Sequence, residues 1–193
     1  APNAPGALAD AAIVSGYVNA ANDLAGQALT GTAEANSTVS VYNNGTLLGT
    51  TTANGSGAWS YTLGALAQGS YSLTAKSTDA AGNVGAASTA LAFTVDTAAP
   101  NAPTGLADAA KNAAGYVNSA IQTVTGSAEA NSTVTIYDTN GTTVVGTGVA
   151  NGSGAFSVTL SSLVDGAHTL TAKSTDAAGN VSTVSTGLTL TVD

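Results

Sequence analysis

Apolar and polar side chains alternate with a period of two along most of the chain. Val39 and Val41 fall on one face of such a segment, and Trp59, Tyr61 and Leu63 fall on one face of another. This alternation is typical of a β-strand with one buried and one exposed face. No segment shows the spacing of an amphipathic helix, so the pattern predicts an all-β protein.

Short turn sequences separate the alternating segments and set the number of strands. In the first half of the chain they are NNG from Asn43, NGSG from Asn54, AQG from Ala67 and DAAGN from Asp79. We count seven short strands there, centred near residues 7, 30, 40, 49, 60, 73 and 91. Seven strands with frequent turns predict an Ig-like β-sandwich. The antibody hallmarks are missing, since the chain has no Cys and Trp59 falls on the fifth strand.

The second half of the chain repeats the first. PNAPGALADAA from Pro2 recurs as PNAPTGLADAA from Pro100, and LTAKSTDAAGNV from Leu73 recurs unchanged from Leu170. The repeat length of about 97 residues exceeds that of a solenoid repeat and suits a complete sandwich domain.

We therefore expect two tandem seven-stranded Ig-like β-sandwiches, one over residues 1–96 and one over 97–193. The sequence VDTAAPNAP joins them, and Pro100 and Pro103 favour an extended, semi-rigid linker. Because the chain begins at a domain edge, we also expect it to be a segment of a longer protein.

Composition limits the function classes. The chain is 44% hydrophobic and only 7% charged, whereas disordered chains combine low hydrophobicity with high charge. The net charge is −8, with three Lys and no Arg, so the basic surface that nucleic-acid binding needs is absent. The same acidity disfavours anionic membranes, and no apolar run is long enough for a membrane helix. Without Cys, neither disulfides nor thiolate metal sites can form.

Three long motifs resemble the bacterial Ig-like repeats of giant surface adhesins. They are GTAEANSTVSVYNNGTLLGTTTANGSGAWSYTL, TAKSTDAAGNVG and TVDTAAPNAP, and the resemblance covers nearly the whole chain in both copies. It implies an extracellular, cell-surface stalk whose partners are neighbouring Ig-like repeats of the same chain. It also implies calcium at the domain junctions, where the ion would stiffen the rod.

The acidic residues support a calcium site independently of that resemblance. Eight of the eleven acids form matched pairs between the copies, namely Asp10 with Asp108, Glu34 with Glu129, Asp79 with Asp176 and Asp96 with Asp193. In a sandwich, the loops that carry Glu129 and Asp176 share the pole where the chain enters, and Asp96 leads into that pole. Calcium binds carboxylate and carbonyl oxygens. We therefore expect a junction site formed by Asp96, Glu129 and Asp176, with Asn180 and backbone carbonyls.

The first copy carries Glu34, Asp79 and Asn83 at the equivalent positions, and without a preceding Asp its site is expected to be incomplete. A simpler interpretation remains open for both copies. Asp79 and Asp176 would then make Asx-turns, Asn83 and Asn180 would adopt left-handed conformations, and both Glu residues would be solvated.

A few other residues must be weighed as signs of catalysis or of ligand binding. His168, the only His, replaces Tyr71 of the first copy, which indicates ring packing with a polar tip rather than catalysis. Lys76 and Lys173 are interpreted as outward residues that discourage edge pairing. An enzyme would need a paired catalytic group that the sequence lacks, so we predict none. The alternative function is a glycan- or surface-binding module, which would cluster rings such as Tyr17, Tyr42, Tyr116 and Tyr137 on one open face.

Overall fold

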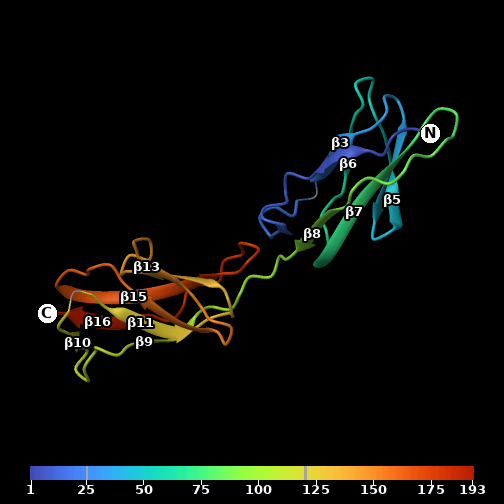
Figure 1. Cartoon of the computed structure of the whole chain (residues 1–193). Helices are drawn as coiled ribbons and strands as arrows, with labels where there is room; N and C mark the ends of the chain where they lie inside the picture. The colour runs from blue at the N-terminus through green and yellow to red at the C-terminus, as the bar shows by residue number, and fades with distance from the viewer. Residues whose placement is uncertain (25, 120) are drawn as a thin grey trace. The chain divides into compact units, whose positions relative to one another are not determined.

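A computed structural model describes residues 1–24, 26–119 and 121–193 (Figure 1). It divides into two compact units, Ala1–Thr97 and Ala98–Asp193. The described residues form only strands and loops, and each unit is a sandwich of two antiparallel sheets with one short parallel strand added.

Unit 1 pairs a three-stranded sheet with a five-stranded sheet, in the orders β1-β3-β6 and β2-β8-β7-β4-β5. Its strands are β1 (Gly6–Ala9), β2 (Tyr17–Val18), β3 (Ala28–Thr32), β4 (Thr38–Asn43), β5 (Thr46–Thr52), β6 (Ala58–Thr62), β7 (Gly69–Thr78) and β8 (Leu91–Val95).

Unit 2 has the same topology, in the orders β14-β11-β9 and β10-β16-β15-β12-β13. Its strands are β9 (Thr104–Asp108), β10 (Tyr116–Val117), β11 (Thr123–Ser127), β12 (Thr133–Tyr137), β13 (Val144–Val149), β14 (Ala155–Thr159), β15 (Gly166–Thr175) and β16 (Leu188–Val192).

The all-β, Ig-like fold class is confirmed, and each of the seven predicted strand centres of unit 1 falls within a strand. The prediction missed one further strand in each unit, β2 and its counterpart β10. Each has two residues and pairs in parallel with the last strand of its unit, as Tyr17 does with Thr94. Two residues are too few to show an alternating pattern, so only the pairing identifies such a strand.

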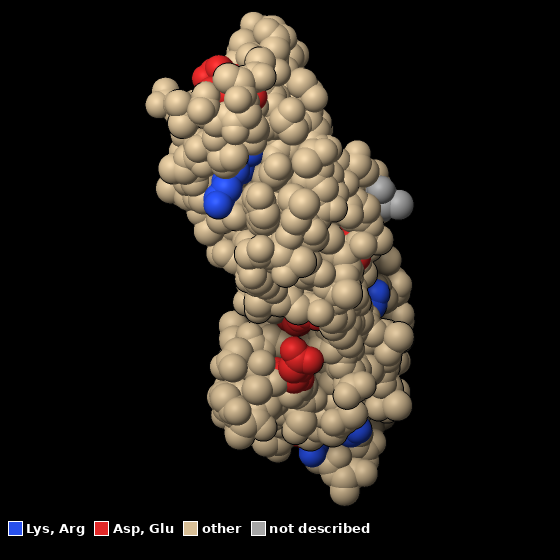
Figure 2. All heavy atoms as spheres, turned by 90° about the vertical axis from the view of Figure 1, so that its right-hand side faces the viewer, with Lys and Arg blue, Asp and Glu red and all other residues tan. Residues whose placement is uncertain are grey.

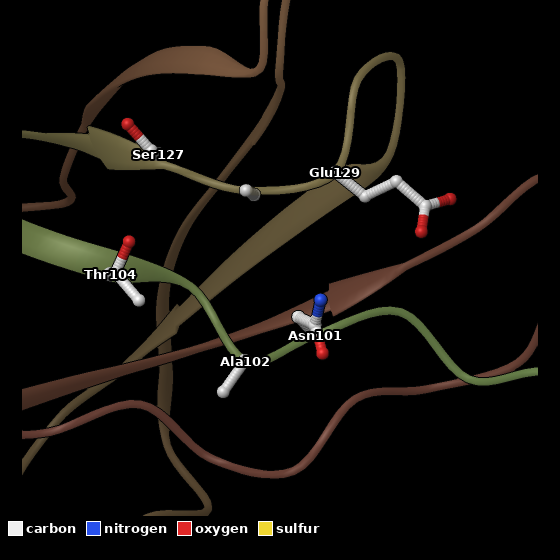
Figure 3. Close-up of a pocket in the computed structure, with 6 residues that line it drawn as sticks. Asn101, Ala102, Thr104, Ser127 and Glu129 are labelled. Carbon is white, nitrogen blue, oxygen red and sulfur yellow. The ribbon is translucent and has the colours of Figure 1, made fainter.

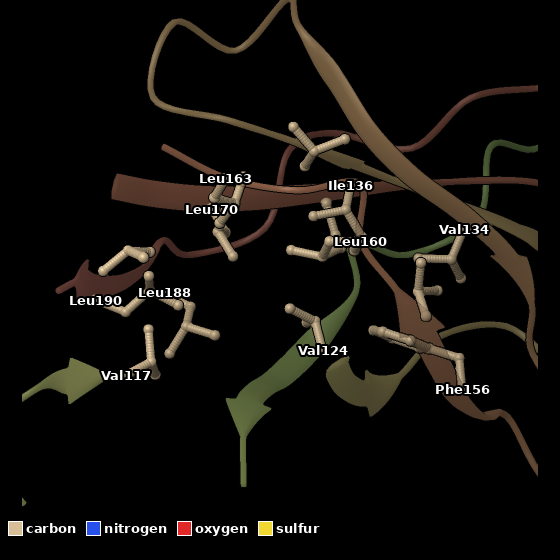
Figure 4. Packing of buried hydrophobic residues seen from close by; sticks show 14 of the residues in the cluster. Val117, Val124, Val134, Ile136, Phe156, Leu160, Leu163, Leu170, Leu188 and Leu190 are labelled. Atoms are coloured by element: carbon tan, nitrogen blue, oxygen red, sulfur yellow. The ribbon is translucent and has the colours of Figure 1, made fainter. Parts of the chain in front are cut away.

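Each unit has its own core between its two sheets, and Figure 4 shows the core of unit 2. Trp59 and Phe156 are both only 5% exposed and occupy equivalent places in the two cores. Trp59 packs against Gly31, where an added Cβ would lie 2.6 Å from the ring atom Cζ2. Gly126 faces Phe156 in the same way, with a distance of 2.6 Å to Cζ. The strand that carries each glycine can therefore approach the ring only without a side chain.

The predicted role of Lys76 and Lys173 at a sheet edge is wrong. They belong to β7 and β15, which lie inside the five-stranded sheets with strands on both sides. The Lys76 ammonium lies 5.8 Å from the centroid of the Tyr42 ring, and the Lys173 ammonium lies 6.0 Å from that of Tyr137. Each Lys therefore makes a cation–π contact on the outer face of its sheet.

Candidate metal sites in the loops

The structure brings Glu129 and Asp176 to one end of unit 2, which we call its N-terminal pole. Thr104, at the start of β9, pairs with Ser127, at the end of β11, just before the loop that carries Glu129. Thr133, the first residue of β12 after the Glu129 loop, pairs with Thr175, the last residue of β15. The loop that follows β15 and carries Asp176 therefore begins at the same end.

Glu129 lines an open concavity of about 450 Å³ with Asn101, Ala102, Thr104, Ser127 and Ala128 (Figure 3). Its side chain is exposed, and its carboxylate accepts no hydrogen bond from the described residues. Glu34 lines the matching concavity of unit 1, of about 340 Å³, with Asn3 and its neighbours. An exposed carboxylate with all its lone pairs free can serve as a metal ligand.

Asp176 and Asn180 close the DAAGN turn of unit 2. The amide and side chain of Asn180 donate to Asp176 Oδ1 and Oδ2, at 2.8 and 2.9 Å. The Asp176 amide donates to the Asn180 carbonyl at 3.1 Å. A carboxylate offers about four lone-pair sites. The Asp176 carboxylate can therefore hold its turn and still donate a lone pair to a cation.

Asp79 and Asn83 repeat this turn in unit 1. Asp79 Oδ1 accepts the Ala81 and Asn83 amides at 3.0 and 2.9 Å, and Oδ2 accepts the Asn83 side chain at 2.8 Å. The Asn83 side-chain hydrogen bond is the main cause that lowers the pKa of Asp79 below 3.8. The Asx-turn interpretation is therefore confirmed for Asp79, and Asp176 closes its turn through the hydrogen bonds from Asn180. The left-handed residue of each turn was misassigned, because the positive φ angles belong to Gly82 at 86° and Gly179 at 90°.

Asp96 directly follows β8. It lies at the end of unit 1 opposite to the one that carries Asp79, and we call this end the C-terminal pole of unit 1. Val95 pairs with Gly69, at the start of the ten-residue strand β7, and Asp79 follows the far end of that strand. At about 3.4 Å per residue, β7 separates Asp96 and Asp79 by roughly 30 Å. Over the described ranges 1–24, 26–119 and 121–193, no three His, Cys, Asp or Glu side chains form a metal-binding group. Calcium at Asp96, Glu129 and Asp176 therefore stays a prediction.

The sequence reasoning missed a buried ion pair in unit 2. Nδ1 of His168, which is 7% exposed, lies 3.0 and 2.9 Å from the two carboxylate oxygens of Asp138. Nε2 lies 2.9 Å from the Val164 carbonyl. The Val164 carbonyl and an ionised Asp138 carboxylate both accept hydrogen bonds, so this geometry suits an imidazole with both ring nitrogens protonated. The two copies held the signal, because Asp138 replaces Asn43 just as His168 replaces Tyr71.

The pKa of each partner follows from these contacts. Burial lowers the pKa of His168, but its hydrogen bonds to Val164 and Asp138 outweigh that effect and raise the pKa above 6.5. Burial raises the pKa of Asp138, but hydrogen bonds from Thr139 and His168 outweigh it and hold the pKa below 3.8. The contacts between the two side chains therefore favour the charged form of each.

The sequence reasoning also missed two buried carboxylates, Asp10 in unit 1 and Asp108 in unit 2, which are 7% and 8% exposed. Their identity in the two copies was visible in the sequence, but their burial was not. Elsewhere charged side chains are few, and the face in Figure 2 shows them as small, separate groups. Among the described residues, no helix is long and apolar enough to cross a bilayer.

Both halves of the chain match families of known domains. Residues 19–97 match the family described as Bacterial Ig-like domain, and residues 99–191 match the Bacterial Ig domain.

Individual relatives extend this likeness. A solved structure described as a Ca²⁺-stabilized adhesin that helps an Antarctic bacterium reach out and bind ice is 28% identical. It matches 100% of this chain and 50% of its own, with a TM-score of 0.50. The fibronectin(III)-like modules of Clostridium thermocellum CbhA share the fold at 20% identity and a TM-score of 0.56, over 97% of this chain and 94% of theirs.

A curated enzyme also matches part of the chain. Chitinase A1 of Niallia circulans is 40% identical over 123 residues, which span 60% of this chain but only 16% of that enzyme. The similarity therefore concerns a small part of the chitinase. With two Ig-like sandwiches that each match a bacterial Ig family, the chain belongs to the bacterial Ig-like domains, as a tandem of two.

Proposed function

We propose that this tandem is a non-catalytic extender segment of a bacterial cell-surface adhesin. The observation that carries the proposal is the match of the whole chain, through both sandwiches, to the adhesin from an Antarctic bacterium. Such a segment acts by its length and stiffness, and its partners are neighbouring Ig-like repeats of the same protein. It would lie outside the cell.

The surface offers little support for the alternative, a glycan-binding module. Tyr17 and Tyr42 lie in one sheet of unit 1, but β8 and β7 separate their strands. Tyr116 and Tyr137 are separated in the same way in unit 2. Tyr42 and Tyr137 also lie beneath lysine ammonium groups. Within each unit these rings therefore do not form a single open aromatic patch, which a sugar-binding face would need.

The proposal includes a calcium ion that joins Asp96 of unit 1 to Glu129 and Asp176 of unit 2. Glu129 is exposed with its carboxylate free of hydrogen bonds to described residues, and Asp176 keeps a lone pair beyond those its turn uses. Clustered carboxylates repel one another, and a divalent cation reverses that repulsion. Bending between the units would then break coordination bonds, so the ion would stiffen their connection.

Glu129→Gln tests this site with little structural cost, because the Glu129 carboxylate holds no turn. Small-angle scattering and thermal melting would be recorded for the full chain in calcium and in EGTA. For wild type we expect calcium to raise the melting temperature and narrow the range of inter-unit distances. Binding to the folded state alone contributes about 2.7 kcal/mol at a hundredfold excess over Kd. Glu129→Gln should lose most of the narrowing of inter-unit distances and the part of the melting shift that the junction ion contributes.

Glu34→Gln is the matched control, since Glu34 occupies the equivalent position in unit 1, at the pole far from Asp96. It should respond to calcium as wild type does. Wild-type curves that are the same in calcium and EGTA would remove calcium from the proposal and leave the acids as turn-formers. Specific binding of the chain to a glycan array would favour the alternative function.

A further inference from the structure

Unit 2 buries two side-chain oxygens that have no hydrogen-bond partner in the described structure, Asp108 Oδ2 and Gln122 Oε1. Asp108 is paired with Val124 across β9 and β11, and Gln122 lies two residues before Val124. The two side chains are therefore diagonal neighbours on the inner face of one sheet, within reach of each other. Gln122 Nε2 already donates to the Ser119 carbonyl, so Oε1 is the atom left over.

Unit 1 repeats this arrangement with Asp10 and Gln27, which are 7% and 8% exposed. Asp10 Oδ2 and both polar atoms of the Gln27 amide lack partners in the described part of the unit. Asp10 and Gln27 also line an open concavity of about 680 Å³, together with Asn22, Leu24 and neighbouring small residues. The site therefore lies beside a route from solvent.

The Asp–Gln pair persists although the segment between its members has changed. Between Asp10 and Gln27 the chain reads AAIVSGYVNAANDLAG, whereas between Asp108 and Gln122 it reads AAKNAAGYVNSAI, which is shorter and differs at many positions. A duplication copies every residue, but a pair that keeps the same unpaired oxygens through such changes points to a shared requirement.

That requirement is charge compensation. A buried carboxylate is costly unless it is paired or coordinates a metal. Within the described ranges the one ion pair is His168 with Asp138, so neither Asp10 nor Asp108 has a cationic partner. Lys111 is near Asp108 in sequence, yet its ammonium donates to the Thr189 carbonyl at 2.6 Å. A water molecule could donate to both oxygens, but it would leave the charge in place.

We propose that each unit binds a hard cation, calcium or sodium, between the Asp and Gln oxygens: Asp10 Oδ2 with Gln27 Oε1, and Asp108 Oδ2 with Gln122 Oε1. Such ions take oxygen ligands, and backbone carbonyls and water complete the shell. One carboxylate per site makes the binding weak, with a calcium Kd of about 10⁻⁴–10⁻³ M, as in extracellular modules. This site is separate from the proposed junction site, because all its ligands belong to one unit.

The double variant Asp10→Asn, Asp108→Asn tests the proposal. In wild type, Asp10 Oδ1 accepts the Ala12 amide at 2.9 Å and Asp108 Oδ1 accepts the Ala110 amide at 2.8 Å. Asn keeps this acceptor and replaces only the unpaired oxygen, so the turn remains and the charge is removed. In metal-free, low-sodium buffer the variant should melt at a higher temperature than wild type, because it no longer buries an uncompensated charge.

Binding would be measured on the full chain by calorimetric titration with calcium chloride and by amide NMR, with sodium and potassium chloride as separate arms. In wild type, the Ala12 and Ala110 amide signals should shift with calcium or with sodium, and the arm that shifts them identifies the ion. The double variant should lose two calcium sites, or its sodium response if sodium is the ion, and those shifts should vanish.

Glu129→Gln separates this result from the junction site, since it should keep the Ala12 and Ala110 responses whether or not the junction binds calcium. The proposal is wrong if the Ala12 and Ala110 amides move with neither ion and the double variant binds as wild type does. The unpaired oxygens would then face only water.

Discussion

Trp59 and Phe156 occupy the same place in the two cores, but only Trp59 carries a polar atom there. The indole Nε1 is buried and has no hydrogen-bond partner among the described residues. A buried polar group without a partner costs about 1–3 kcal/mol. The position therefore favours a purely apolar ring, and unit 2 already has one.

Trp59→Phe should leave the free energy of unfolding of unit 1 within about 1 kcal/mol of wild type, because the relief of the unpaired N–H offsets the lost ring contacts. The reverse change, Phe156→Trp, adds ring volume and an N–H to a filled site and should cost unit 2 about 1–3 kcal/mol. Denaturant unfolding followed by circular dichroism measures both. A loss of several kcal/mol in Trp59→Phe would show that the indole has a partner, such as a buried water.

Gly126 shows how closely the backbone approaches these rings. An added Cβ would lie 2.6 Å from Phe156 Cζ and 2.9 Å from the Thr104 carbonyl oxygen. Gly126→Ala should therefore destabilise unit 2 by at least the 1–3 kcal/mol typical of overpacking. Gly152→Ala is the control, because nothing lies within 4 Å of its added Cβ. Equal unfolding midpoints for the two variants would contradict the close packing.

At the scale of strands and loops, the His168–Asp138 pair makes the attachment of the β12–β13 hairpin to β15 sensitive to pH. His168 lies on β15, and Asp138 lies in the connection that follows β12, so the pair fastens the β12–β13 hairpin to the long strand beside it. In unit 1, Tyr71 donates to the Ala67 carbonyl at 3.0 Å and stacks on Phe93. Unit 1 thus fills the same place without a titrating imidazole.

The pKa of His168 is raised above 6.5 in the folded state, so its contribution to stability is complete below about pH 6.5 and is lost as pH rises through the folded pKa. The pKa of Asp138 is lowered below 3.8, so its contribution is present above about pH 3.8 and is lost as pH falls through its folded pKa. Unit 2 should gain from the pair between these limits. Melting curves from pH 3 to pH 9 would reveal this window.

His168→Tyr introduces the residue that unit 1 has at this position, Tyr71. It should remove the decrease in the melting temperature of unit 2 that the loss of the His168 charge causes above about pH 6.5. The Asp138→Asn variant should lower the melting temperature of unit 2 between about pH 3.8 and pH 6.5, because it removes the negative partner of His168. If His168→Tyr keeps the wild-type pH dependence, the transition belongs to another group.

At the scale of the whole molecule, the buried hydrophobic residues that the structure describes form one core cluster in each unit. Leu73 and Leu170 are both 0% exposed at equivalent positions. Truncation of either to Ala should cost its own unit about 2–5 kcal/mol. Differential scanning calorimetry should show one transition lowered in Leu73→Ala and the other in Leu170→Ala. A single transition that moves equally in both variants would mean that the units unfold together.

Much of the fold follows from local chemistry that the sequence displays. Successive side chains of a strand point to opposite faces, so the alternation around Val39, Val41 and Trp59 identifies the buried face of each strand without knowledge of its neighbours. Turn residues such as those from Asn43 to Gly45 act over a few positions. The exact recurrence of LTAKSTDAAGNV and the turns closed by Asp79 and Asp176 are equally local. The strand centres and the buried rings could therefore be predicted.

The remaining features depend on which strands become neighbours. The parallel strand β2 exists only because β8 pairs with it, and Lys76 lies over Tyr42 because β7 is an inner strand. His168 meets Asp138, and Asp10 is buried near Gln27, across turns or loops whose conformations decide the contact.

The sequence alone determined that the chain forms two similar all-β sandwiches, because strand alternation, turn chemistry and the repeat are encoded within short stretches. Only the tertiary structure decided which charges are buried and what they face. Asp10 and Asp79 look alike in the sequence, yet Asp79 lies in a turn that satisfies both its oxygens, whereas Asp10 leaves an unpaired oxygen in the interior. The desolvation of a side chain depends on all the residues that pack around it, and these come from several strands that are distant in the sequence. A local sequence pattern therefore cannot show it.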